Sequence, residues 1–293
     1  MFIKERIFPR LNRTSHRNIL SEVQPGLNIP RIIHQTFYDK VLPPELEHNV
    51  KQIREMNPNW DYRFYDDSDI VEFISVNYSP KILEYFFRID QSYGAARADL
   101  FRYLLMFKVG GFYLDIKSNT TKPLDSVLHD ADQFLLSIWN SQNGEYQGWG
   151  KHYELREFGG DEFQQWFIAC SPGHPFLRSV IENVLQNIDM YIPILHGTGK
   201  NGVLRVTGPI AYSLAIHKTL SNHSYRIVDS DNDLGLKYSI FIGNSHMAQF
   251  KSHYSLQTLP IVKIKFIKNK LIFFYKFTKF VQRFVKTINI KKW

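Results

Sequence analysis

Hydrophobic and polar positions along the chain follow two periods, one typical of short strands and one typical of helices. The segment RIIHQTF (31–37) is β-branched and predicts a strand, and PPELEHNVKQIREM (43–56) predicts a polar helix opened by prolines. The turn-rich NPNWDYRFYDD (57–67) predicts a second strand. Strand, helix and strand in this order indicate a βαβ unit, the building block of a parallel sheet covered by helices.

Three more helices are predicted before the next strand. DSDIVEFI (67–74) starts with an aspartate suited to a helix cap, and SPKILEYFFRI (79–89) starts with a serine followed by a proline. The stretch 93–111 keeps apolar residues at helical spacing and ends in the pair Gly110 and Gly111, which favours a helix stop.

The remaining elements are predicted from shorter signals. FYL (112–114) is a core strand that ends at Asp115. The others are a strand in QFLLSIW (133–139), a long irregular loop at 140–161, an apolar segment and a helix within 163–188, a helix in 208–220, and short strands and loops in 225–260, of which YSIFIG (238–243) is the clearest strand.

Length and composition indicate a globular protein. The 293 residues, 44% of them apolar, are enough for one large domain or two small ones. We divide the chain into a mixed lead-in (1–29), a main domain (30–260) and a basic aromatic tail (261–293). The one cysteine, Cys170, rules out an internal disulfide framework, and we interpret it as a small buried hydrophobe.

No membrane-crossing or secretory segment is predicted. The first residues carry Lys4, Glu5 and Arg6 where a secretory signal needs an apolar run, and 18 consecutive apolar residues occur nowhere. We therefore expect a cytoplasmic protein, and peripheral attachment to a membrane stays open.

The net charge of +8 is concentrated in the tail. Residues 261–293 contain ten Lys or Arg and no acidic residue, which leaves 26 basic against 28 acidic side chains in 1–260. Within the tail, aromatic and cationic side chains recur in two stripes at helical spacing, which predicts an amphipathic helix. It is suited to an anionic membrane surface, or to packing on the domain. Nothing outside the tail supports nucleic-acid binding, so we expect no nucleic-acid partner.

The stretch before the core strand carries charges that point to a ligand site. Asp99 and Arg102 are three positions apart and share a helix face, and the following glycine turn leads into the strand that ends at Asp115. In doubly wound folds, ligands bind at such an edge of the sheet. Arginine suits phosphate and aspartate suits a ribose or a divalent ion, so an anionic nucleotide is a natural ligand. The alternative is an ordinary solvated ion-pair cluster.

Several motifs in a fixed order resemble a known family. They are IPRIIHQTF, NPNWDYRFYDD, RADLFRYLLMFKVGGFYLDIKS, ACSPGHPF, TGP and SHYS, spread over about residues 30–256. The chain resembles glycosyltransferase family 32, the retaining glycosyltransferases with a DXD sugar-binding region, which include yeast initiation-type mannosyltransferases and bacterial capsular polysaccharide glycosyltransferases. The resemblance implies a GT-A (Rossmann-like) α/β fold with a central mixed sheet flanked by helices, a nucleotide-sugar donor and Mn²⁺ or Mg²⁺.

The resemblance also implies a nucleotide site. His34, Gln35 and Thr36 match the positions that line the base pocket, with a polar strand end as the alternative interpretation. We also assign Arg97, Asp99 and Lys117 to this nucleotide-binding site. Arg97 is the first residue of the most specific motif.

The reacting sugar and its diphosphate are implied to lie at a second group of residues. Asp99 and Arg102 match those that hold the ribose or the donor sugar, and Asp115 matches the first aspartate of the DXD motif. Gln165 falls where we expect an asparagine near the sugar. Negative charge develops on the departing diphosphate, and a cation beside it lowers the barrier.

Position 117 departs from the family pattern, because a lysine stands where the second aspartate is usual. A protonated lysine cannot bind a metal ion and repels one. Three interpretations follow: the metal is held by Asp115 with other ligands such as His253, Lys117 itself offsets the diphosphate charge, or the chain is a weak relative that still binds. Since Ile116 alternates with its neighbours, Asp115 and Lys117 are expected on one face.

The sequence thus predicts a retaining glycosyltransferase that moves a hexose from a UDP- or GDP-sugar to a glycan or glycolipid acceptor. The alternative is a non-catalytic nucleotide-sugar or membrane-binding relative that lacks the second DXD aspartate.

Overall fold

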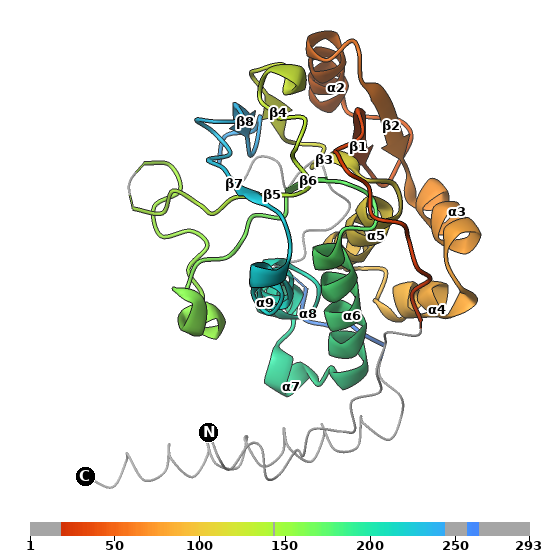
Figure 1. The fold of residues 1–293 in the computed structure, drawn as a ribbon. Helices are drawn as coiled ribbons and strands as arrows, with labels where there is room; N and C mark the ends of the chain where they lie inside the picture. Colours follow the sequence, from red (N-terminus) through yellow and green to blue (C-terminus); the bar gives the residue numbers. More distant parts are fainter. Residues whose placement is uncertain (1–18, 143, 244–256, 264–293) are drawn as a thin grey trace, which may run out of the picture.

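The computed structural model describes residues 19–142, 144–243 and 257–263, and its centre is a four-stranded sheet with the order β2–β1–β3–β6 (Figure 1). Strands β1, β2 and β3 are parallel, and β6 runs antiparallel to β3. This confirms the predicted α/β fold with a mixed central sheet. The bounds are β1 Ile32–Thr36, β2 Asp61–Tyr65, β3 Gly111–Leu114 and β6 Phe167–Cys170.

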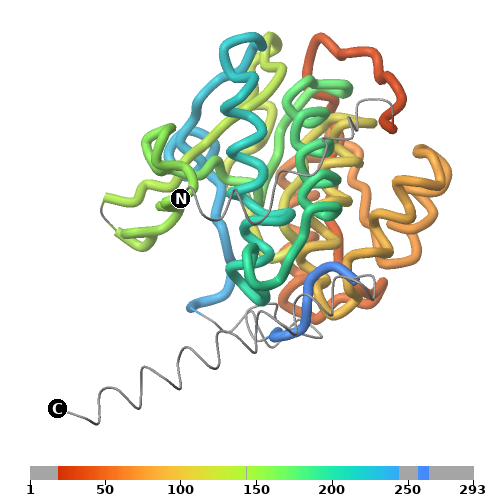
Figure 2. The backbone as a smooth tube through the Cα atoms, turned by 90° about the horizontal axis from the view of Figure 1, so that it is seen from below, coloured from red at the N-terminus to blue at the C-terminus, as the bar shows by residue number. Residues whose placement is uncertain are grey.

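Helices flank this sheet, and α6 packs alongside both α5 and α9 (Figures 1 and 2). The predicted helices are confirmed, and the short helices α7 and α8 were not expected. The bounds are α2 Pro44–Met56, α3 Asp67–Asn77, α4 Pro80–Arg88, α5 Gly94–Val109, α6 Pro175–Met190, α7 Pro193–His196, α8 Gly199–Val206 and α9 Pro209–His217.

Two small sheets lie beside the main one. β4 (Asn119–Thr120) pairs with β8 (Leu236–Lys237), and β5 (Leu135–Leu136) pairs with β7 (Arg226–Ile227). Three 3₁₀ turns complete the described elements: η2 Leu124–Ser126, η3 Tyr153–Phe158 and η4 Leu220–Asn222. The η3 turn interrupts the loop predicted at 140–161.

The predicted strand in YSIFIG (238–243) is wrong, because these residues form bends and a turn. The segment is apolar because of tertiary packing: Ile240 and Phe241 pack against the cluster that includes Phe37, Leu46 and Ile116.

The two faces of the main sheet belong to two different apolar clusters. Tyr113 and Ile168 point to the side where α3–α6, α8 and α9 pack. Phe112 and Phe167 point to the opposite side, where their stacked rings lie 6.0 Å apart. The strict alternation along β3 and β6 therefore fixes which residues face the helices.

Helix α5 is more deeply buried than its pattern suggests. Every residue from Asp99 to Phe107 is buried, including the charged Asp99 and Arg102, so the alternative of a solvated ion-pair cluster is wrong. The turn after α5 needs glycine: Gly111 has φ +105°, and a Cβ there would lie 2.6 Å from the Ile32 carbonyl oxygen. The turn thus brings the helix end directly onto β1.

Both predicted flanking segments touch the domain where the structure describes them. Leu20, in the lead-in, is buried in the large helical cluster, as are Ile261 and Val262 at the start of the tail. The backbone N–H of Asp90 donates to the carbonyl of Ile261 at 2.7 Å. Residues 264–293, which carry the predicted amphipathic pattern, lie outside the described residues, and the domain boundaries stay predictions. In the described ranges, no helix has the length and apolar content to cross a bilayer.

Candidate active site

The fold gathers four charged side chains at the carboxyl ends of β1 and β3. Because these strands are parallel, Thr36 at the end of β1 and Asp115 directly after β3 reach the same edge of the sheet. Asp99 and Arg102 come to this edge from α5. Lys117 follows from the turn after β3. We call Asp99, Arg102, Asp115 and Lys117 the charged cluster.

Asp99 is an internally satisfied carboxylate that is 3% exposed. Its Oδ1 accepts a hydrogen bond from Gln165 Nε2 at 3.1 Å and lies 3.5 Å from the Arg102 guanidinium, and its Oδ2 accepts from the Thr207 hydroxyl at 2.9 Å. Burial raises the pKa of Asp99, and Arg102 and the two hydrogen bonds oppose that rise. Asp99 therefore ties α5 to the segment before β6 and to the end of α8.

Arg102 connects the two carboxylates of the cluster. Its Nη1 lies 3.1 Å from Asp115 Oδ1 and donates to the Gln165 carbonyl at 2.8 Å, and its guanidinium lies over the Tyr113 ring at 4.7 Å. Burial acts to lower the pKa of Arg102, but Asp115, Tyr113 and Asp99 raise it overall. The guanidinium is thus a permanent buried cation.

Asp115 is the most accessible member, with a side chain 21% exposed against 5–9% for the other three. Its backbone N–H donates to the Trp166 carbonyl at 2.8 Å, which fixes the end of β3 against the residues before β6. Its Oδ1 also accepts from the Tyr113 hydroxyl at 3.4 Å. An incoming ligand therefore meets Asp115 first.

Lys117 points toward Asp115, as predicted, but for a different reason. Residues 116 and 117 form a turn rather than a strand continuation, in which Ser118 N–H donates to the Asp115 carbonyl. Lys117 Nζ lies 3.8 Å from Asp115 Oδ2, 3.3 Å from the centre of the Tyr238 ring, and donates to the Tyr238 carbonyl at 3.3 Å. The ammonium is thus held in place from three sides.

Lys117 stays cationic at neutral pH. Burial lowers its pKa to about 8, partly offset by Asp115. The four groups of the charged cluster therefore alternate in sign, from Asp99 through Arg102 and Asp115 to Lys117, and their formal charges cancel.

The end of β1 reaches the same edge through a second set of bonds. Gln35 Nε2 donates to the Asp115 carbonyl at 3.3 Å, and Thr36 Oγ1 lies 3.2 Å from the Tyr113 hydroxyl. His34 is buried further back, with Nε2 3.0 Å from the Gly110 carbonyl and Nδ1 3.3 Å from a tyrosine hydroxyl. The carbonyl requires a proton on Nε2, and burial lowers the pKa of His34 to about 4, so the ring is neutral.

Among the described residues, the predicted site residue Arg97 does not join the cluster. The Arg97 guanidinium donates to the Ile89 carbonyl at 2.9 Å and lies over the Phe86 ring at 5.3 Å, so it closes the end of α4. His253 lies outside the described residues. Gln165, by contrast, does join, through Asp99 and through the Tyr103 hydroxyl at 3.2 Å.

Sequence reasoning missed three contributors. Three residues outside the charged cluster hold its members in place: Thr207, Tyr238 and Trp166. Of these, only Thr207 lies in a motif that the sequence analysis noted, TGP at 207–209. Tyr238 brings an aromatic group with it, since four other rings lie 5.2–6.4 Å from its own: Trp139, Tyr146, Trp149 and Trp166. These rings form one wall of the site beside Lys117.

The described side chains do not fit a metal site by themselves. Within the described ranges no group of three or more His, Cys, Asp or Glu could hold a metal ion. Both oxygens of Asp115 already face cations, and both oxygens of Asp99 already accept hydrogen bonds. A divalent ion needs several free oxygen ligands.

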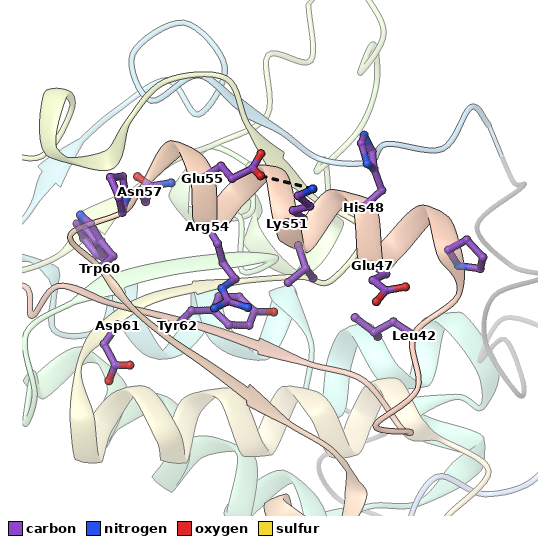
Figure 3. Close-up of a pocket in the computed structure, with 13 residues that line it drawn as sticks. Leu42, Glu47, His48, Lys51, Arg54, Glu55, Asn57, Trp60, Asp61 and Tyr62 are labelled. Carbon is purple, nitrogen blue, oxygen red and sulfur yellow. Dashed lines mark ion pairs between the residues drawn. The ribbon is translucent and has the colours of Figure 1, made fainter.

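A groove on the described surface is lined by none of the charged-cluster residues. It encloses ≈ 940 Å³ between α2 and β2 and is lined by charged and aromatic side chains, among them Glu47, Arg54 and Tyr62 (Figure 3). Arg54 lies over the Tyr62 ring at 5.5 Å. One link between the groove and the site is the Tyr62 hydroxyl, which donates to Gln35 Oε1 at 2.9 Å.

Comparison with known proteins identifies the region that forms the cluster. Residues 43–134 match the family described as glycosyltransferase sugar-binding region containing DXD motif. This match and the similar proteins below support the resemblance to glycosyltransferase family 32. All four residues of the charged cluster lie within this matched region.

The curated proteins to which the chain is similar include fungal mannosyltransferases. It is 27% identical over 175 residues to inositol phosphoceramide mannosyltransferase 3 of Schizosaccharomyces pombe (58% of this chain, 42% of the relative). It is 25% identical over 236 residues to the initiation-specific alpha-1,6-mannosyltransferase of the same yeast (76% and 56%). The chain spans about half the length of the curated relatives it matches.

Solved structures resemble it more distantly. The PaToxG glycosyltransferase shares 16% identity at a TM-score of 0.48 and covers 68% of this chain and 71% of its own. The UDP-bound glycosyltransferase domain from the YGT toxin shares 10% identity at a TM-score of 0.45 and covers 74% and 84%.

Proposed function

We propose that this chain is a retaining glycosyltransferase that transfers a hexose from a nucleoside diphosphate sugar to a hydroxyl of a glycan or glycolipid. The observation that carries the proposal is the arginine bridge: Arg102 joins Asp99 and Asp115 at the carboxyl edge of the sheet, inside the family region. The names of the relatives favour a hexose such as mannose, and three of them name inositol phosphoceramide.

The reaction exchanges one bond for another at the anomeric carbon. The bond from sugar C1 to the diphosphate oxygen breaks, and its electron pair stays with the diphosphate. The acceptor oxygen bonds to the same face of C1 that the diphosphate left, and the hydroxyl proton passes to the departing diphosphate. Because negative charge grows on that group, fixed cations beside it stabilise the transition state.

We assign roles from the contacts of each side chain. Asp115, the most accessible of the cluster, contacts the donor, and Arg102 offsets charge beside it. Asp99 and Gln165 act as positioning residues, because their polar atoms bond to other protein groups. Gln35 and Thr36 lie at the same edge, and we place the nucleotide there.

Two predicted parts of this function stay predictions. Mn²⁺ or Mg²⁺ binding requires a ligand such as His253, outside the described residues, in addition to Asp115. Peripheral binding to an anionic membrane involves the basic tail, and liposome flotation with and without residues 264–293 tests it: equal bound fractions would exclude a role for the tail.

Donor hydrolysis tests the proposed function and separates it from the non-catalytic alternative. Purified protein is incubated with UDP- and GDP-hexoses, with Mn²⁺ or with EDTA, and released nucleoside diphosphate is measured. A transferase slowly transfers the hexose to water in place of the acceptor and so releases the nucleoside diphosphate. Binding without release, seen as a thermal shift with no product, would identify a non-catalytic relative instead.

A further inference from the structure

The charge balance at position 117 suggests how the site handles the donor diphosphate. In the usual DXD pattern an aspartate stands where this chain has Lys117, and the change from −1 to +1 adds two positive charges. Two is also the charge of the divalent cation that a DXD site binds. The site with Lys117 thus carries the net charge of a DXD site already loaded with its ion.

We propose that Lys117 is a built-in replacement for the divalent cation, so that this chain binds the donor diphosphate without a metal ion. This inference rests on the proposed function. It assigns Lys117 Nζ, together with Arg102, the task of offsetting the diphosphate charge beside Asp115.

The first support is the position of the ammonium group. Nζ lies 3.8 Å from Asp115 Oδ2, the oxygen that faces away from Arg102. Metal–oxygen distances are about 2.0–2.6 Å, so an ion on that oxygen would lie within about 6 Å of Nζ. The two cations would compete for one carboxylate oxygen, and Lys117 is covalently in place.

The second support is that Lys117 is held rather than free. Its side chain is 9% exposed, its ammonium lies over the Tyr238 ring, and Nζ donates to the Tyr238 carbonyl. The Ser118 hydroxyl donates to the same carbonyl at 2.7 Å, which fixes the turn. A solvent-facing lysine has no such support, so a preorganised cation is the better description.

The third support is the state of the carboxylates. Asp99 is satisfied by Thr207, Gln165 and Arg102, and Asp115 is shared between two cations. The described cluster therefore offers no second carboxylate to complete an ion's ligand set, whereas it does offer two fixed cations to a diphosphate.

The test restores the aspartate. Binding of UDP and of GDP is measured by calorimetry, in EDTA and in Mn²⁺, for wild type, Lys117→Asp and Lys117→Met. Lys237→Asp, an exposed lysine on β8, makes the same charge change elsewhere. Mn²⁺ binding is followed separately by the loss of the free-ion electron paramagnetic resonance signal, which needs no activity.

We expect wild type and Lys237→Asp to bind one nucleotide equally, within about twofold, in EDTA and in Mn²⁺. Lys117→Asp should bind at least tenfold more weakly in EDTA, recover in Mn²⁺ and take up the ion. Lys117→Met should bind weakly in both, and it serves as the folded control if Lys117→Asp loses its cooperative melting.

Two results would overturn the inference in different ways. Wild-type binding that strengthens tenfold or more with Mn²⁺ shows that Lys117 does not replace the ion, and leaves the proposed transferase standing. Wild type that binds neither UDP nor GDP in either condition, while melting cooperatively, overturns the transferase as well.

Discussion

Arg102 on α5 and Asp115 after β3 lie 3.1 Å apart, and this ion pair joins the helix to the edge of the sheet where the strands end. Only Asp115 of the two reaches solvent to a substantial degree, with a side chain 21% exposed against 7%. The pair therefore presents a carboxylate to a ligand while keeping its cation beneath the surface.

Removing the buried cation should cost stability through Asp99. Arg102→Met leaves Asp99 buried without its charge partner, and we expect a loss of about 3–5 kcal/mol in the free energy of unfolding. Asp99→Asn in the same chain removes the unpaired charge, so the double variant should be more stable than the sum of the two single losses predicts. Urea unfolding of the four proteins measures this, and strictly additive losses would show that the two groups are not coupled.

Asp115→Asn should remove activity and leave the fold intact. The amide keeps the shape of the side chain but not the negative charge that positions Arg102 and Lys117, so we expect donor turnover to fall about 100-fold or more. Asp130→Asn, an exposed carboxylate outside the site, is the matched control and should turn over as wild type does. Both melting temperatures should stay near that of wild type. Full turnover by Asp115→Asn would place the reacting centre elsewhere.

The Tyr238 ring should matter for Lys117 more than its hydroxyl. Tyr238→Leu removes the ring over which Nζ lies at 3.3 Å, a contact worth about 0.5–2 kcal/mol, and opens the aromatic wall. Tyr238→Phe keeps the ring. We expect nucleotide binding in EDTA to weaken several-fold in the leucine variant alone, as measured by calorimetry. Equal weakening in both would assign the effect to the hydroxyl.

Acid should destabilise the protein through His174, which caps α6. Its Nδ1 accepts from Phe176 N–H and its Nε2 donates to the Ser224 carbonyl, so the folded ring is neutral, and burial lowers its pKa to about 4. In the unfolded chain the same ring has a pKa near 6.5. The contribution of His174 to the stability of the fold is therefore present above about pH 6.5 and is lost as the pH falls toward 4.

His174→Asn keeps a side chain that can cap the helix but does not titrate. The difference in unfolding free energy between wild type and this variant should therefore change by up to about 3 kcal/mol between pH 7 and pH 4, in favour of the variant at low pH. Urea unfolding across this range measures it. Parallel pH curves would mean that burial does not lower the pKa of His174 in the folded state.

Local pattern was enough to predict the sheet and most helices, because each has its own signal. The prolines before α2, α4 and α6 mark helix starts, and the glycine pair places α5 directly before β3. That short connection is also why Asp99, Arg102 and Asp115 could be expected together.

Long-range contacts could not be predicted in the same way. Thr207 contacts Asp99 from 108 positions away in the sequence, and Tyr238 contacts Lys117 from 121 positions away. No periodicity in the sequence predicts contacts between residues so far apart. Arg97 shows that nearness in sequence can also mislead. It is two positions from Asp99, and on a helix two positions differ by about 200° in direction, so its side chain points away from the site. The burial of α5 on all sides could not be predicted, because charged residues at helical spacing also suit an ordinary solvated ion-pair cluster.

The most direct test of the transferase is proton NMR of a donor incubated with the protein. For a UDP- or GDP-hexose with an α-linked sugar, the anomeric proton signal of the intact donor should disappear. The free hexose should appear first as the α anomer, before mutarotation. This is the result expected of a retaining enzyme with its site at Asp115. A folded wild-type protein that leaves every UDP- and GDP-hexose intact, or releases the β anomer first, would contradict it.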